Sequence, residues 1–187
     1  MSTRSTIPWG TVVITAEPQG SARTARLGMT LALAGIGMLF TAFTSAYVVR
    51  QGLDPDWQAI PMPAVLLPNT LVLLASSLCL EKARRTAGNG WLWTTLLLGG
   101  LFVAGQFAAW AQLRDRGLYF VSNAHSSFFY LLTAAHGVHL AGGLLALSAA
   151  AFIGPLWRAR WLGIAAMYWH FMGVLWLYLL FLLYGLK

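Results

Sequence analysis

Charged residues are scarce in this chain, and acidic residues are the scarcest. Asp, Glu, Lys and Arg make up only 9% of the 187 residues, whereas soluble domains carry about 25% charged residues. All of them lie near the ends of the sequence or between long apolar stretches. A charge in the middle of a bilayer is costly and usually marks a transport route. The distribution therefore indicates a membrane protein that packs against something, and not one that carries ions through charged groups of its own.

Cysteine is almost absent too, and this excludes two kinds of structure. The single residue, Cys79, excludes an internal disulfide and a cysteine-based zinc site. The net charge of +7 comes from basic residues scattered between apolar runs. That scatter is typical of membrane-flanking anchors and does not resemble a nucleic-acid footprint.

Apolar runs dominate the rest, since 58% of the residues are hydrophobic. About 20 apolar residues cross a bilayer as a helix, and helices or closed barrels are the only structures that pair every backbone group there. We therefore predict an all-α integral membrane protein, with a polar tail at the membrane surface over 1–25 and a five-helix transmembrane domain over 26–187. The predicted spans are 27–49, 62–80, 91–113, 124–153 and 161–186.

The basic residues predict an orientation. Eight of them fall on the side of the tail, namely Arg4, Arg23, Arg26, Lys82, Arg84, Arg85, Arg158 and Arg160. Four fall on the opposite side, namely Arg50, Arg114, Arg116 and Lys187. The richer side should be cytoplasmic, which places the N-terminus inside and the C-terminus outside.

Small residues line several of the spans. They form ridges that include Gly99 and Gly105 in the third span, Gly137 in the fourth and Gly35 in the first. Such faces let helix backbones approach closely in lipid. We expect a compact bundle in which these ridges are contacts between helices.

A few polar side chains lie within the spans and are candidates for contacts between helices. They are His136, His139, His170, Trp169, Thr133, Gln106 and Asn69. Neutral histidines can form hydrogen bonds across helices through both ring nitrogens, and this is the interpretation we favour. Metal or haem ligation by the three histidines and proton handling are the alternatives. No nucleophile and base pair occurs in the spans, so we predict no catalytic residue and no metal site. His125, near the mouth of the fourth span, is expected at the interface.

Four arginines beside the spans are candidates for binding lipid headgroups: Arg114, Arg116, Arg158 and Arg160. Anionic headgroups attract basic residues at such places. The alternative is a solvated flank that only sets the orientation.

Two short segments carry a resemblance to a known family. The fourth span contains His136-Gly137-Val138-His139, and the fifth contains Tyr168-Trp169-His170-Phe171. Together with Leu67-Pro68-Asn69-Thr70, Gln106 with Trp110, and Ser45-Ala46-Tyr47, they resemble subunit III of the haem–copper terminal oxidases, the cytochrome c oxidase subunit III family, in its five-span bacterial form. The resemblance covers nearly all of residues 27–184, in order.

The resemblance implies a role as well as a fold. Members of the family bind no haem or copper themselves, pack on the catalytic subunit I, and through the complex associate with subunit II. They hold phospholipid and support proton uptake and turnover. This chain would then be a multi-pass protein of the bacterial cytoplasmic membrane, with haem and copper in its partner subunits.

Three acids that the family usually has are missing. Ile36, Ala109 and Gly173 stand where membrane carboxylates are expected, so the chain lacks the groups of a proton antenna. Other interpretations of the whole pattern are an accessory subunit of a nitric oxide reductase system, a small transporter, and a membrane metalloenzyme that uses the three histidines.

Overall fold

The computed structural model describes residues 18–53, 57–86, 89–152 and 155–185, and the side chains of 18–22 and 155–159 are excepted. This part of the chain forms five helices: α1 (Pro18–Leu53), α2 (Leu66–Arg85), α3 (Gly90–Asp115), α4 (Ala124–Phe152) and α5 (Pro155–Gly185). All five are long and apolar enough to cross a membrane. The predicted five-helix membrane protein is confirmed.

Three helix starts differ clearly from the predicted spans. Helix α1 begins at Pro18, so its first residues belong to the segment that we expected as a polar tail. Helix α2 begins at Leu66, four residues after the expected Met62. Pro61 and Pro63 precede it, and each proline lacks a backbone donor and disfavours helix at the residue before it. The other predicted starts lie within a few residues of the observed ones, except that α5 begins at Pro155.

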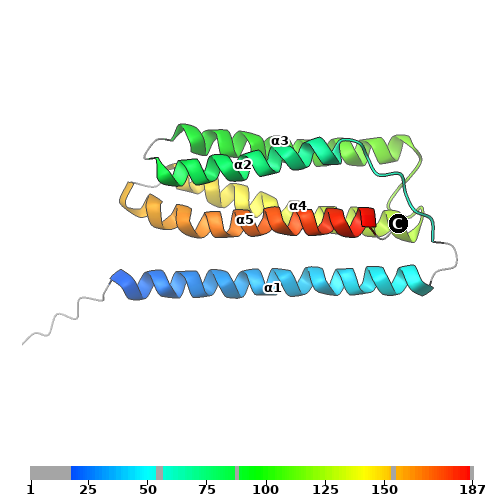
Figure 1. The fold of residues 1–187 in the computed structure, drawn as a ribbon, viewed down its shortest axis with the longest axis horizontal. Helices are drawn as coiled ribbons and strands as arrows, with labels where there is room; N and C mark the ends of the chain where they lie inside the picture. The colour runs from blue at the N-terminus through cyan, green and yellow to red at the C-terminus, as the bar shows by residue number, and fades with distance from the viewer. Residues whose placement is uncertain (1–17, 54–56, 87–88, 153–154, 186–187) are drawn as a thin grey trace, which may run out of the picture.

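The helices run along one common axis (Figure 1). Helices α2 and α3 lie together on one side, α1 lies on the opposite side, and α4 and α5 lie between them. The start of α1, the end of α2 and the start of α5 share one end of the bundle, and the end of α5 lies at the other (Figure 1). The basic residues Arg26, Lys82, Arg84 and Arg85 therefore gather at one end, because successive helices run in opposite directions.

Helix α1 contacts the bundle along a narrow seam. Its buried residues Leu33, Phe40 and Tyr47 recur every seven residues, which is the spacing of a coiled-coil contact. At this seam, the Tyr178 hydroxyl of α5 donates to Thr44 Oγ1 over 2.9 Å. Most other α1 side chains are exposed, for example Leu31 and Met38, so the lipid or a partner must cover most of this helix.

Local sequence signals define the turn between α3 and α4. Gly117 adopts a φ of 75°, a conformation that favours glycine. The Gly117 amide donates to the Arg114 carbonyl and the Leu118 amide to the Leu113 carbonyl, which is a Schellman ending. Asn123 Oδ1 then accepts the Ser126 amide at 2.7 Å and caps α4. These contacts fix the conformation of the turn between α3 and α4, beside His125.

The close helix contacts occur at only some of the expected glycines. A Cβ added at Gly99 would meet Leu144 and Trp169, one at Gly105 would overlap the Asn69 amide, and one at Gly143 would meet Tyr168 and Trp169. At Gly137 and Gly35 nothing lies within 4 Å of such an atom. The expectation of a close contact at Gly137 is therefore wrong within this chain, because that face of α4 points away from the other described helices.

The two kinds of glycine predict different outcomes for the same substitution. Gly105→Ala should destabilise the protein by about 1–3 kcal/mol, because overpacking displaces the Asn69 amide. Gly137→Ala should be neutral or slightly stabilising, because alanine is the better helix former. Thermal unfolding of the detergent-purified protein measures both, and equal effects at the two positions would contradict the packing described here.

Candidate functional site: the polar core of the bundle

Indole-to-hydroxyl hydrogen bonds join the helices near mid-bundle. Trp176 Nε1 of α5 donates to Thr70 Oγ1 of α2 over 2.9 Å, and both residues are buried. Trp110 Nε1 of α3 donates to Thr133 Oγ1 of α4 over 3.0 Å. Each threonine hydroxyl in turn donates to a carbonyl of its own helix, those of Leu66 and Phe129. Thr133 thus lies in a contact between α3 and α4.

Helices α2 and α3 are joined by side chains that bond to backbone. Asn69 Nδ2 donates to the Phe102 carbonyl at 2.9 Å, and Ser76 Oγ donates to the Thr95 carbonyl at 3.2 Å. Asn69 lies against Gly105, the glycine whose missing side chain leaves room for the amide. Because Gly105 has no side chain, the Asn69 amide fits against α3 at this position.

The three candidate histidines face different neighbours. His136 is fully buried, with its ring 5.2 Å from that of Trp176 and 6.1 Å from that of Phe102. His139 Nδ1 pairs with the Ala135 carbonyl of its own helix at 2.7 Å. Its ring lies 5.8 Å from that of Phe40 on α1. Among the described residues, neither side chain forms a hydrogen bond to another helix, so their role across helices stays a prediction. The His139 carbonyl, however, accepts the Tyr168 hydroxyl of α5 at 2.7 Å.

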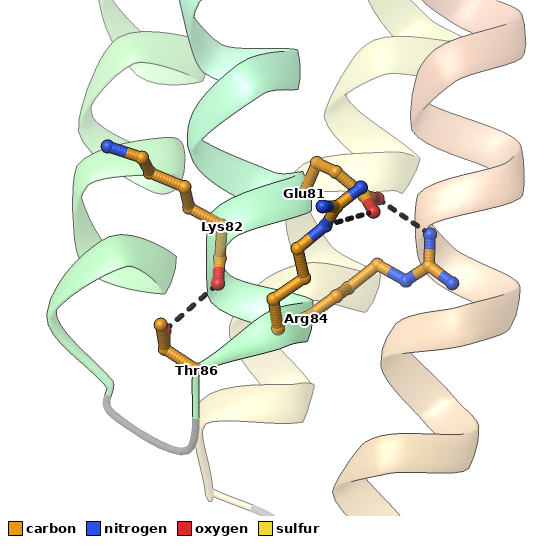
Figure 2. A network of polar contacts seen from close by, with 5 residues as sticks. Glu81, Lys82, Arg84 and Thr86 are labelled. Carbon is orange, nitrogen blue, oxygen red and sulfur yellow. Dashed lines mark hydrogen bonds and ion pairs between the residues drawn. The ribbon is translucent and has the colours of Figure 1, made fainter.

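His170 lies closer to one end of the bundle. It is half-buried, and its ring interacts electrostatically with the charged side chains of Glu81 and Arg84. Figure 2 shows the group at the end of α2, in which Glu81 pairs with Arg84 at 2.8 Å. Arg85 pairs with the same carboxylate at 3.0 Å. These pairs are exposed, and exposed ion pairs contribute little to stability.

Within the described residues, no group of three or more His, Cys, Asp or Glu side chains could hold a metal ion. His136, His139 and His170 therefore do not meet around a common point in this part of the chain. Two further predicted residues, Gln106 and Trp169, are buried, and their side-chain nitrogens have no hydrogen-bond partner among the described residues.

His125, the second residue of α4, makes contacts that sequence reasoning missed. It is fully buried, and its ring stacks on Trp57 at 5.1 Å. Its Nδ1 lies 3.3 Å from the Ile60 amide, and its Nε2 lies 3.4 Å from the Tyr47 hydroxyl. The amide can only donate, so Nδ1 accepts and Nε2 carries the proton in the neutral ring. His125 thus joins α1, α4 and the segment before α2. No local sequence pattern indicated this contact, because Ile60 and His125 are 65 residues apart.

The lipid candidates are distributed over both ends. Arg114 and Arg116 are exposed at the end of α3, and Arg116 Nη1 lies 3.4 Å from the Pro61 carbonyl. Arg160 is exposed near the start of α5, and the side chain of Arg158 lies outside the described residues. A shallow groove of about 790 Å³ opens between α1 and the start of α4, with Arg50, Val49, Leu53 and Phe128 among its lining residues. Its walls are mainly apolar.

The positions of the missing acids lie inside the bundle. Ala109 is fully buried, and Ile36 packs partly buried on the core. A Cβ at Gly173, which is buried, would meet Ser77 Oγ at 3.7 Å. These places are filled by small or apolar groups, so the chain keeps its core free of carboxylates.

Comparison with known proteins identifies the family. The chain is 31% identical to cytochrome c oxidase subunit 3 of Synechocystis sp. over 179 residues, which covers 84% of this chain and 73% of the relative. It belongs to the cytochrome c oxidase subunit 3 family. It is also 30% identical to a probable cytochrome c oxidase subunit 3 of Nocardia farcinica (78% and 79% covered) and 29% identical to the subunit of Bacillus sp. (84% and 84% covered). No family model matches the chain.

This membership confirms the resemblance and makes the chain a multi-pass membrane protein of a cytochrome c oxidase complex. It also favours the oxidase over the nitric oxide reductase and transporter alternatives, because the curated relatives carry the oxidase name.

Loss of the Trp176–Thr70 bond should weaken the bundle measurably. We expect Thr70→Val to lower the stability by about 0.6–2 kcal/mol, the range for hydrogen bonds between membrane helices. Thr41→Val is the matched control, because Thr41 is exposed and its hydroxyl bonds only to Gly37 of its own helix. Unfolding in detergent with increasing denaturant compares the two variants, and equal midpoints would contradict a role for this bond.

Removal of the His125 ring nitrogens should loosen the segment before α2. His125→Phe keeps an aromatic ring beside Trp57 but leaves the Ile60 amide without its acceptor. Amide hydrogen exchange at residues 57–60 should therefore become faster. His139→Phe is the control, since it contacts α1 at Phe40 and not this segment. Unchanged exchange in His125→Phe would refute the assignment.

Proposed function

We propose that this chain is the non-catalytic subunit III of an oxygen-reducing haem–copper cytochrome c oxidase in a bacterial cytoplasmic membrane. Its family membership carries the proposal. The described core offers indoles, hydroxyls and apolar side chains and is free of carboxylates. Such a core suits a scaffold, and electron and oxygen chemistry is left to haem and copper in the partner subunits.

The chain is proposed to pack directly against subunit I and to associate with subunit II through the complex. The large exposed apolar faces support this. They include Leu71 and Leu78 on α2, Leu97 on α3 and Val138 on α4. In a membrane such faces meet either lipid or another subunit. The weak burial of α1 supports the same conclusion, since this helix has most of its surface available.

The orientation is proposed with the N-terminus inside. The described basic residues at the shared end of α1, α2 and α5 are Arg23, Arg26, Lys82, Arg84, Arg85 and Arg160. At the opposite end they are Arg50, Arg114 and Arg116. The richer end is expected in the cytoplasm, and Lys82 Nζ lies 4.3 Å from the centre of the Trp91 ring there, as an interfacial pair would.

Bound phospholipid is the second part of the proposal. Arg114 and Arg116 stand exposed at one end of α3, and the groove beside Arg50 has mainly apolar walls. A basic side chain beside an apolar groove can bind a lipid phosphate while the groove holds the acyl chain. Lipid held in this way would support turnover and proton uptake by keeping the partner subunit's surface ordered, without carboxylates on this chain.

Affinity purification from native membranes in mild detergent tests the assignment. A tagged chain should bring down a haem- and copper-containing subunit I, seen by haem absorbance, copper analysis and mass spectrometry. Recovery of a stable haem-free monomer would contradict the proposal, and co-purification of nitric oxide reductase subunits would replace it. Deletion of the chain should lower oxygen consumption per haem and the rate of proton uptake in the remaining complex.

A further inference from the structure

Gln106 and His136 place four polar atoms in the bundle core without a hydrogen-bond partner among the described residues. They are Gln106 Nε2 and Oε1 and His136 Nδ1 and Nε2. Gln106 is 5% exposed and His136 is 0% exposed. A buried polar atom that stays unpaired costs about 1–3 kcal/mol. Four such atoms in one place need a specific partner.

The contacts between α3 and α4 on either side of Gln106 allow its position relative to His136 to be inferred. These helices are antiparallel neighbours, joined at one level by the Trp110–Thr133 bond and at another by the ring contact between Phe102 and His136. Gln106 lies midway between Phe102 and Trp110, one turn from each and on the same face of α3. It therefore lies on the face of α3 that packs on α4, between the levels of Thr133 and His136.

The surrounding polar groups are already engaged. The Thr133 hydroxyl accepts Trp110 and donates to Phe129. The Trp176 indole donates to Thr70, and the Thr70 hydroxyl donates to Leu66. The rings of Phe102 and Trp176 form the other walls beside His136. No further side-chain donor or acceptor in this group is left for the imidazole.

A direct bond between the two side chains is not sufficient. The ring nitrogens of an imidazole point in diverging directions, and in the neutral ring one donates while the other accepts. One amide reaches only one of them. The remaining nitrogen still needs a small partner that can both donate and accept, and in a protein core water is the usual one.

We propose that Gln106 and His136 hold at least one ordered water molecule in the centre of the bundle. The water donates to the accepting ring nitrogen or accepts from the ring N–H, and its other bonds go to the Gln106 amide. It fixes the imidazole tautomer and joins α3 to α4 beside the Trp110–Thr133 bond. The ligand class of this site is water alone, since the walls carry no charge.

Electron cryo-microscopy of the chain, purified from native membranes with its partners, tests the proposal. The map must show ordered water elsewhere in the membrane-spanning region. We expect a density peak within hydrogen-bond distance of one His136 ring nitrogen and of the Gln106 amide. A map of that quality with no peak at His136 would overturn the proposal, and so would a peak that contacts neither ring nitrogen.

Solid-state NMR of protein labelled at histidine and leucine, in lipid, gives a second measurement, and its first result comes from the wild-type protein. Magnetisation transferred from water should appear on the His136 nitrogens at a mixing time that is too short for it to reach the buried Leu140 methyl groups. In Gln106→Leu this transfer should be lost or strongly reduced. Gln112→Leu, the same change six residues along α3, should leave it unchanged. Absence of transfer in the wild-type protein would refute the site.

Discussion

The structure depends on one constraint: inside a bilayer, no bulk water satisfies a polar group, so every polar side chain in the spans must find its partner within the bundle or at its ends. The indole–hydroxyl bonds Trp176–Thr70 and Trp110–Thr133 meet this demand. In both, the hydroxyl also donates to its own helix, so each threonine satisfies an indole without leaving its own proton unpaired.

Packing follows from the same constraint. The hydrophobic effect does not drive helices together in lipid, so close contact depends on shape. Gly99, Gly105 and Gly143 supply the space into which large side chains from neighbouring helices fit. The result is a tight unit of α2 to α5, to which α1 is added along a single seam.

The same constraint accounts for what the core contains. The described core consists of apolar and aromatic side chains with a few hydroxyls, amides and imidazoles. In this member of the cytochrome c oxidase subunit 3 family, Ala109 and Gly173 are buried at positions where the resemblance leads us to expect acids. A core of this kind is consistent with the scaffold role proposed above.

The amino-acid sequence by itself determined the five helices and the family, because the length and composition of apolar runs depend only on local order along the chain. It also identified which polar residues lie inside the spans. It did not determine their partners: Gly137 looked like Gly105, and nothing indicated what His125 contacts. Only the tertiary structure decided these points, because the azimuth of each helix around its axis sets which face meets a neighbour. The histidine that bonds across elements depends on a backbone amide 65 residues distant, and no local pattern records such a contact.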